Sequence, residues 1–314
     1  MSAETLLFIP IPVAAFVLDM LFGDPHGLPH PVRWIGTAIN HLETSCRRMD
    51  AYILPEISGG FAVLTLTTVV AWIADFLTSL EPGGIIIAVY LAYAGLALQG
   101  LVREARNVLQ LLQQDEIDQA RTALSMLVSR DTSQMDAEAI RRSLAETVSE
   151  NFSDGFVAPF FYLMMLGIPG MWAYKTVNTF DSMWGYRTER FARLGMIAAR
   201  TDDILNWIPA RLSWLLLCVT GWAMRLNAGT AMSKTPAQAR TMESPNAGWP
   251  MAACAWLLQG SMGGAVTYFG TVKQKPRLGP ENGLWSNGRL NTLLRLAIRT
   301  GWLTAALGGI IWLI

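Results

Sequence analysis

The chain has 314 residues, of which 52% are hydrophobic and only 15% are charged. Soluble domains carry about 25% charged residues, so much of this surface faces something other than water, and a lipid bilayer is the natural candidate. Lys and Arg number 24, as do Asp and Glu, and this zero net charge excludes the strongly basic balance that is typical of nucleic-acid-binding proteins.

Three apolar segments near the N-terminus are long enough to cross a bilayer. A transmembrane helix needs about 20 mostly apolar residues, and this criterion selects residues 6–22, 60–80 and 85–101. The turn-forming sequence Glu81-Pro82-Gly83-Gly84 joins the last two as a hairpin. No Lys or Arg precedes the first segment, so we interpret it as a retained membrane segment and not as a removable signal peptide.

The density of charged residues rises over residues 103–154. Apolar residues recur there at helical spacing, as at Val108, Leu111 and Leu112, which predicts amphipathic helices outside the bilayer core. Such helices can also lie flat on the lipid headgroups. The arginines of this stretch favour the cytoplasmic side by the positive-inside rule. We therefore expect one membrane-embedded domain, residues 1–314, in which residues 102–154 form a cytoplasmic helical insertion.

Residues 156–173 are apolar, but Pro159 and the sequence Gly167-Ile168-Pro169-Gly170 interrupt them. A re-entrant or internally buried segment accounts for these interruptions and for the cationic loops on both sides, whereas a full crossing would place one polar loop on each side of the membrane. Further candidate spans are residues 207–224, the Gly-rich residues 251–269 and the apolar tail 290–314. The predicted fold class is all-α: a polytopic integral membrane protein with amphipathic cytoplasmic helices, a re-entrant segment and about four to seven spans.

A first group of polar residues follows the first apolar segment. Gly23-Asp24-Pro25 is followed by His26 and His30, with Pro29 and Pro31 beside the second histidine. The prolines preclude a regular helix through both histidines, so their spacing does not indicate a metal site. A rigid turn leaving the membrane and a ligand-binding role for His30 and Arg33 remain equally consistent with this pattern.

Glu146, Glu150 and Asp154 form a column on one helix face if the helix continues to Gly155. Three like charges in a column repel one another unless a cation lies among them, and oxygen ligands of this kind suit Mg²⁺. The alternative is a solvated acidic face. Because the column adjoins an apolar segment, we favour a functional role.

A polar stripe consists of Lys175, Asn178 and Asp181 or Ser182 on an otherwise apolar helix. An unpaired charge at the bilayer centre costs at least about 2.5 kcal/mol, so these groups must pair inside the protein. The alternative to a binding site is a self-neutralising cluster of salt bridges, although arginine is well suited to phosphate and carboxylate. A second polar group follows, with Arg200, Asp202, Asp203, Asn206 and Arg211.

Two loops, residues 243–250 and 268–279, are rich in turn-forming residues and would by themselves be connectors, although Asn246 can present an amide to a substrate. The chain contains neither a GxxxxGK phosphate loop nor a GxGxxG turn, so the sequence does not itself demonstrate nucleotide binding. The three cysteines are far apart, and we interpret them as reduced packing residues.

These motifs together resemble those of the adenosylcobinamide-phosphate synthase family, the CbiB/CobD family of cobalamin biosynthesis. They occur in the family's order from about Asp19 to Gly279. The matching segments are Gly23-Asp24-Pro25, His30-Pro31-Val32-Arg33-Trp34-Ile35-Gly36, Arg130-Asp131-Thr132-Ser133, Glu146-Thr147-Val148, Tyr174-Lys175-Thr176-Val177-Asn178-Thr179, Asp202-Asp203, Pro209-Ala210-Arg211-Leu212 and Ser244-Pro245-Asn246.

The resemblance implies an ATP-dependent amide ligase of the bacterial inner membrane, with its active site facing the cytoplasm. ATP would activate the free propionate carboxylate of adenosylcobyric acid, and aminopropanol phosphate or aminopropanol would supply the amine. Mg²⁺ is the implied cofactor and ATP a co-substrate. Expected partners are these substrates, the lipid bilayer and other late cobalamin-assembly enzymes. The alternatives are a non-catalytic corrinoid transporter or sensor and a regulatory membrane protein.

The roles that we assign to single residues are hypotheses that rest on this resemblance. The catalytic candidates are Glu146, Glu150, Asp154 and Lys175. The candidates for binding substrate or phosphate are His30, Arg33, Arg130, Asn151, Asn178, Arg200, Asn206, Arg211 and Asn246. Carboxylates hold Mg²⁺ together with substrate phosphates, and the metal candidates are Glu150, Asp154, Asp181, Asp202 and Asp203.

Overall fold

The computed structural model describes residues 10–24, 30–186, 188–268 and 271–313. The chain folds into two compact units. Unit 1 consists of Met1–Leu96, Ala158–Asn206 and Gly308–Ile314, and unit 2 consists of Ala97–Val157 and Trp207–Leu307. Whether residues 1–314 behave as one domain, with residues 102–154 as an insertion, stays a prediction.

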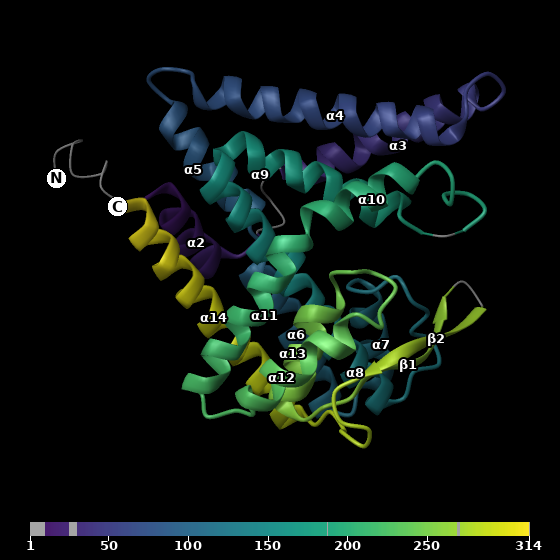
Figure 1. Cartoon of the computed structure of the whole chain (residues 1–314), viewed down its shortest axis with the longest axis vertical. Coiled ribbons are helices and arrows are strands. Elements are labelled where there is room, and N and C mark those ends of the chain that lie inside the picture. The colour runs from purple at the N-terminus through teal and green to yellow at the C-terminus, as the bar shows by residue number, and fades with distance from the viewer. Residues whose placement is uncertain (1–9, 25–29, 187, 269–270, 314) are drawn as a thin grey trace. The chain divides into compact units, whose positions relative to one another are not determined.

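Unit 1 is built from six described helices. In Figure 1, α4 lies over α3, and α9 runs below them; α2 packs against α5. Both α3 and α4 begin at a proline, which suits the first turn because its N–H groups have no partner within the helix. Their bounds are α2 Ile11–Phe22, α3 Pro31–Met49, α4 Pro55–Thr78, α5 Gly84–Gly95, α9 Ala158–Trp184 and α10 Met196–Leu205.

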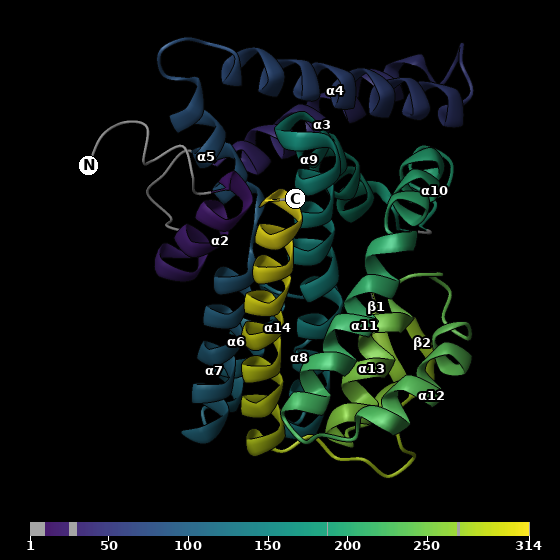
Figure 2. The same ribbon diagram turned by 60° about the vertical axis from the view of Figure 1, so that its left-hand side comes forward.

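Unit 2 surrounds one short helix, α13, whose eleven residues Gly248–Leu258 are all buried. This helix packs against α8, α11 and α12, and Figure 2 shows α11, α12 and the hairpin gathered near it. The other elements are α6 Leu98–Gln113, α7 Ile117–Ser125, α8 Ala137–Phe152, the π-helix Ser153–Val157, α11 Trp207–Ala223, α12 Ala228–Ala239, β1 Met262–Tyr268, β2 Thr271–Leu278 and α14 Asn287–Leu313, whose last turns belong to unit 1.

The prediction of a membrane span over residues 251–269 is wrong. The apolar helix α13 ends at Leu258, and the Gly-rich sequence after it forms β1, which pairs with β2 in an antiparallel hairpin. Gly263 and Gly264 have φ angles of 82° and 89°, a backbone region that favours glycine. The apolar residues of α13 are thus buried in protein, and the two glycines allow the backbone of β1 to adopt positive φ angles.

Four helices in the described part of the chain are long and apolar enough to cross a membrane. They are Pro55–Thr78, Gly84–Gln113, Ala137–Trp184 and Asn287–Trp312, and α10 with α11 adds a fifth if this pair, bent by 44°, forms one span. The protein is therefore an all-α polytopic membrane protein, as predicted. Of the predicted first span, residues 10–22 lie within the described part of the chain, and Ile11–Phe22 forms a shorter apolar helix there.

A break divides α9 at Gly167, where φ is 67° and ψ is −163°. This backbone conformation is essentially restricted to glycine, and Pro169 follows it. The interruption that the sequence predicts at this point is confirmed. Re-entry of the segment into the bilayer stays a prediction, as does the cytoplasmic position of the confirmed helices α6, α7 and α8.

Candidate functional site

In unit 1, the polar stripe of α9 meets α10 around the buried carboxylate of Asp202. The amide of Asn178 donates to one carboxylate oxygen at 3.2 Å, and the amide of Asn206 donates to the other at 2.9 Å. The hydroxyl of Tyr174 donates in turn to Asn206 at 3.0 Å. The structure therefore brings together Asn178, Asp202 and Asn206, three of the candidate binding or metal residues, in a network that also fixes α10 against α9.

Three nitrogen bases of unit 1 act on one another electrostatically. Burial lowers the pKa of His30; the carboxylate of Asp24, 3.7 Å away, raises this pKa, and the charges of Lys175 and Arg33 lower it. Lys175 is buried on α9, whereas His30 and Arg33 lie at the start of α3. The positive charges of Lys175 and Arg33 both act on the His30 imidazole. The start of α3 and the middle of α9 are therefore suited to bind an anionic group.

The exposure of the predicted residues of unit 1 varies: Arg33 is exposed and His30 is half-buried. Asp181 and Asp203 are half-buried, and Arg200 is exposed. Within the described ranges, no three His, Cys, Asp or Glu side chains converge so that they could hold a metal ion by themselves. Mg²⁺ typically takes one or two protein carboxylates and completes its shell with water and phosphate oxygens, so any such site here would need the phosphates of a substrate.

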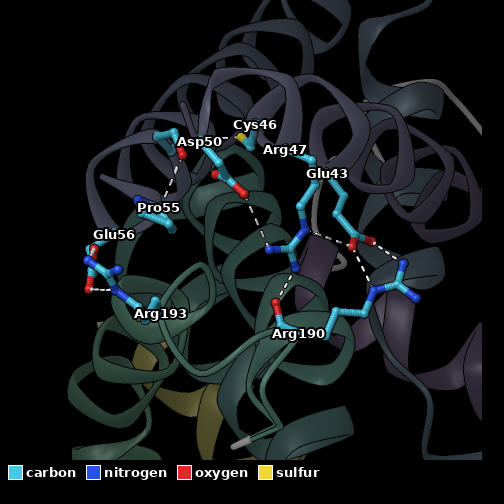
Figure 3. A network of polar contacts seen from close by, with 9 residues as sticks. Glu43, Cys46, Arg47, Asp50, Pro55, Glu56, Arg190 and Arg193 are labelled. Atoms are coloured by element: carbon cyan, nitrogen blue, oxygen red, sulfur yellow. Dashed lines mark hydrogen bonds and ion pairs between the residues drawn. The ribbon is translucent and has the colours of Figure 1, made fainter. Parts of the chain in front are cut away.

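Ion pairs fasten the connection between α9 and α10 to α3 and α4 (Figure 3). The Arg190 guanidinium donates to both oxygens of Glu43, at 2.8 and 3.0 Å. Arg193 holds Glu56 in the same way, at 2.6 and 3.0 Å. Sequence reasoning missed these residues, because no spacing rule relates partners 147 and 137 positions apart.

In unit 2, Glu146 joins three segments of the chain and has no exposed surface. One of its carboxylate oxygens accepts a hydrogen bond from Arg130 at 2.5 Å, and the other accepts the backbone N–H of Gly263 at 2.7 Å. Arg130 also donates to Ser143 at 3.2 Å. Glu146 therefore braces the hairpin and the loop before α8, and both of its oxygens are already engaged.

The predicted acidic column runs from α8 into the π-helix Ser153–Val157. The helix does persist past Asp154, but its turn is wider there; π-turns occur frequently at functional sites. Glu150 and Asp154 are half-buried, and Lys275 of β2 and Arg130 are the cations whose charges act on Glu150. Asn151 is exposed, and its amide donates to the backbone of Thr147 at 2.9 Å.

Arg211 and Asn246 of unit 2 are in contact. The Arg211 guanidinium donates to the Asn246 side chain at 3.3 Å and lies over the rings of Trp207 and Trp249, 4.2 and 4.6 Å from their centroids. The hydroxyl of Ser244 accepts the N–H of Asn246 at 3.3 Å. The loop of residues 243–250, which by itself would be a connector, thus helps to position Arg211.

These features define a class: a polytopic helical membrane protein with clusters of charged and amide side chains buried among its helices. The family model described as CobD/Cbib protein matches residues 12–297. The chain therefore belongs to the CobD/CbiB family, which confirms the resemblance seen in its motifs.

Three relatives show how far the similarity extends. The chain is 42% identical to cobalamin biosynthesis protein CobD of Photorhabdus laumondii, over 85% of this chain and 86% of the relative. It is 39% identical to cobalamin biosynthesis protein CbiB of Salmonella typhi (84% and 85%) and 37% identical to cobalamin biosynthesis protein CobD of Listeria monocytogenes (86% and 87%). No solved structure matches the chain significantly. The role of the protein thus lies in cobalamin biosynthesis.

Proposed function

We propose that the protein is an ATP-dependent amide ligase. It joins the amine of aminopropanol phosphate, or of aminopropanol, to the free propionate carboxylate of adenosylcobyric acid and so forms adenosylcobinamide phosphate or its dephosphorylated form. Family membership supports the pathway. The observation that carries the chemistry is the cluster of half-buried His30, exposed Arg33 and buried Lys175, whose charges suit a phosphate group.

The reaction needs an activated carboxylate, because the oxygen of a free carboxylate is a poor leaving group. A carboxylate oxygen attacks the terminal phosphorus of ATP, and ADP leaves. The amine then attacks the carbonyl carbon of the acyl phosphate, phosphate leaves, and a base takes the proton from the amine nitrogen. Buried Lys175 and exposed Arg33 lower the barrier by neutralising the phosphate oxygens.

Glu150 is the better candidate for this base. Both carboxylate oxygens of Glu146 already accept hydrogen bonds, and the side chain has no exposed surface. Glu150 lies one turn further along the same helix and is half-buried. We therefore assign Glu146 to positioning and Glu150 to proton transfer.

The carboxylates of the protein fit Mg²⁺, which prefers oxygen ligands. Asp181 and Asp203 are half-buried candidates in unit 1, as is Asp154 in unit 2, whereas Glu150, the other half-buried candidate, is assigned to proton transfer. Asp202 would act as a ligand only through lone pairs that its two amide partners leave unused. When bound, the ion would neutralise phosphate charge and orient the phosphates.

The proposed location is the bacterial inner membrane, with the site facing the cytoplasm, where ATP is available. The arginines of residues 103–154 support this orientation by the positive-inside rule. Association with other late cobalamin-assembly enzymes remains an expectation.

Substitution of the half-buried carboxylates tests the metal assignment. Asp203→Asn and Asp154→Asn remove a charge at half-buried positions, and Glu281→Gln does so at an exposed turn as a matched control. In detergent-purified protein, each of the first two variants is expected to lose amide formation, whereas the control keeps it. Unchanged product formation in both Asn variants would overturn the metal assignment.

A further inference from the structure

The guanidinium of Arg211 is held in one orientation by its surroundings. Trp207 and Trp249 cover it, and one of its terminal nitrogens donates to the backbone oxygen of Trp207 at 2.7 Å and to Asn246 at 3.3 Å. The Trp249 ring is itself fixed by a hydrogen bond from its indole nitrogen to the oxygen of Pro245, at 3.1 Å. The other guanidinium nitrogens of Arg211 can donate to a further acceptor.

A second arginine lies near Arg211, because the residues that precede the two arginines, Ala210 and Ala239, pack in one buried cluster with Trp249. This cation is Arg240, an exposed residue that caps the end of α12. The acid of the same loop, Glu243, pairs with Lys273 at 2.6 Å. Among the residues that the structure describes, no carboxylate forms an ion pair with Arg211 or Arg240. Two like charges that act on each other repel, and an anion bound by both would offset the repulsion.

We propose that Arg211 and Arg240 bind one phosphate group of a substrate. Arginine forks match phosphate oxygens in geometry, and a stacked guanidinium loses little freedom when it binds. Arg240 is exposed to water, whereas buried Asn246 accepts a hydrogen bond from Arg211. Ser244 and Pro245 act through their neighbours, because they accept hydrogen bonds from the Asn246 N–H and the Trp249 indole. The Ser-Pro-Asn loop then has a defined role, which is to aim an arginine at phosphate.

This inference rests on the proposed function for its choice of ligand, and that function offers two sources of the same chemistry. One is the phosphomonoester of an amino alcohol, and the other is the phosphate chain of a nucleotide. Either source would place negatively charged phosphate oxygens beside the two arginines. Measuring the binding of an amino-alcohol phosphate and of a nucleotide separately distinguishes the two sources.

The test is isothermal titration of the detergent-purified full chain with aminopropanol phosphate and, separately, with ATP. The variants are Arg211→Lys, Arg240→Gln and the control Lys234→Gln, which removes an exposed charge from the same helix as Arg240. A hydrogen bond to a charged group contributes about 1.5–3 kcal/mol, so Kd for the bound probe should rise about tenfold or more in both arginine variants. It should stay at the wild-type value in Lys234→Gln.

Arg211→Lys keeps the charge but lacks the planar fork, so a large loss in this variant points to stacked, directed binding. Weaker binding in both arginine variants with only one probe identifies the source of the phosphate. Wild-type affinity for both probes in both variants, shown to be folded by near-UV circular dichroism, would overturn the inference. The binding assay needs no turnover, so phosphate binding without amide formation would defeat the proposed ligase activity and leave this site standing.

Discussion

The replacement Glu146→Gln tests whether the Arg130–Glu146 pair holds unit 2 together. The carboxylate accepts a hydrogen bond at each oxygen, from Arg130 and from the N–H of Gly263. Glutamine offers one oxygen and one NH₂ group, so in either orientation a donor faces a donor. The variant also removes the carboxylate that pairs with Arg130, a side chain that is only 7% exposed.

The magnitude follows from burial. Breaking a buried ion pair by changing one partner costs about 3–5 kcal/mol. The glutamine oxygen still accepts one hydrogen bond, so we expect the lower end, about 3 kcal/mol. For a chain of this size each kcal/mol shifts Tm by about 2 °C, so Tm should fall by about 6 °C.

Thermal unfolding in detergent, followed by intrinsic tryptophan fluorescence, measures this shift. Glu138→Gln is the matched control, because Glu138 lies exposed in the first turn of the same helix. The double variant Glu146→Met with Arg130→Met removes both charges and should recover much of the lost stability. Equal Tm values for Glu146→Gln and Glu138→Gln would refute the assignment of Glu146 to structure.

Three further predictions concern unit 1. Nuclear magnetic resonance should show that the pKa of His30 lies below 6.5 and that Lys175→Gln raises this pKa. Folding favours the neutral imidazole, so its contribution to stability is complete above pH 6.5 and is lost as the pH falls through the folded-state pKa. A pKa at or above 6.5 would contradict this. Gly167→Ala should cost about 1–3 kcal/mol because of its backbone angles, whereas Gly229→Ala, which has open space around it, should not lower Tm. Asp202→Asn should lower stability by about 1–3 kcal/mol, because an amide then faces the amides of Asn178 and Asn206. Asp203→Asn should keep Tm and lose activity, and the reverse pattern would exchange the roles of the two aspartates.

Features that depend on local sequence could be predicted. Long apolar stretches identified α4 and α14 because the bilayer sets the length of a span. The break at Gly167 was also predictable, since Gly and Pro close together interrupt a helix. The motifs identified the family because several of them are long and ordered along the chain.

Other features depend on partners far away in the sequence. An apolar segment such as α13 has the same sequence pattern whether lipid or protein surrounds it. The sequence therefore did not predict its burial inside unit 2 or the hairpin that follows it. Helical spacing placed Glu146 and Glu150 on one face, but only the structure shows that Gly263, 117 residues away, binds Glu146. The Glu43–Arg190 pair was hidden for the same reason.

The central claim is amide formation driven by ATP. Purified wild-type protein, incubated with adenosylcobyric acid, aminopropanol phosphate, Mg²⁺ and ATP, should yield the amide product and ADP in equal amounts. Corrinoid mass and ADP are followed in the same samples, and omission of either substrate should abolish both. Corrinoid binding by folded protein without amide or ADP would contradict the account and favour a transporter or sensor.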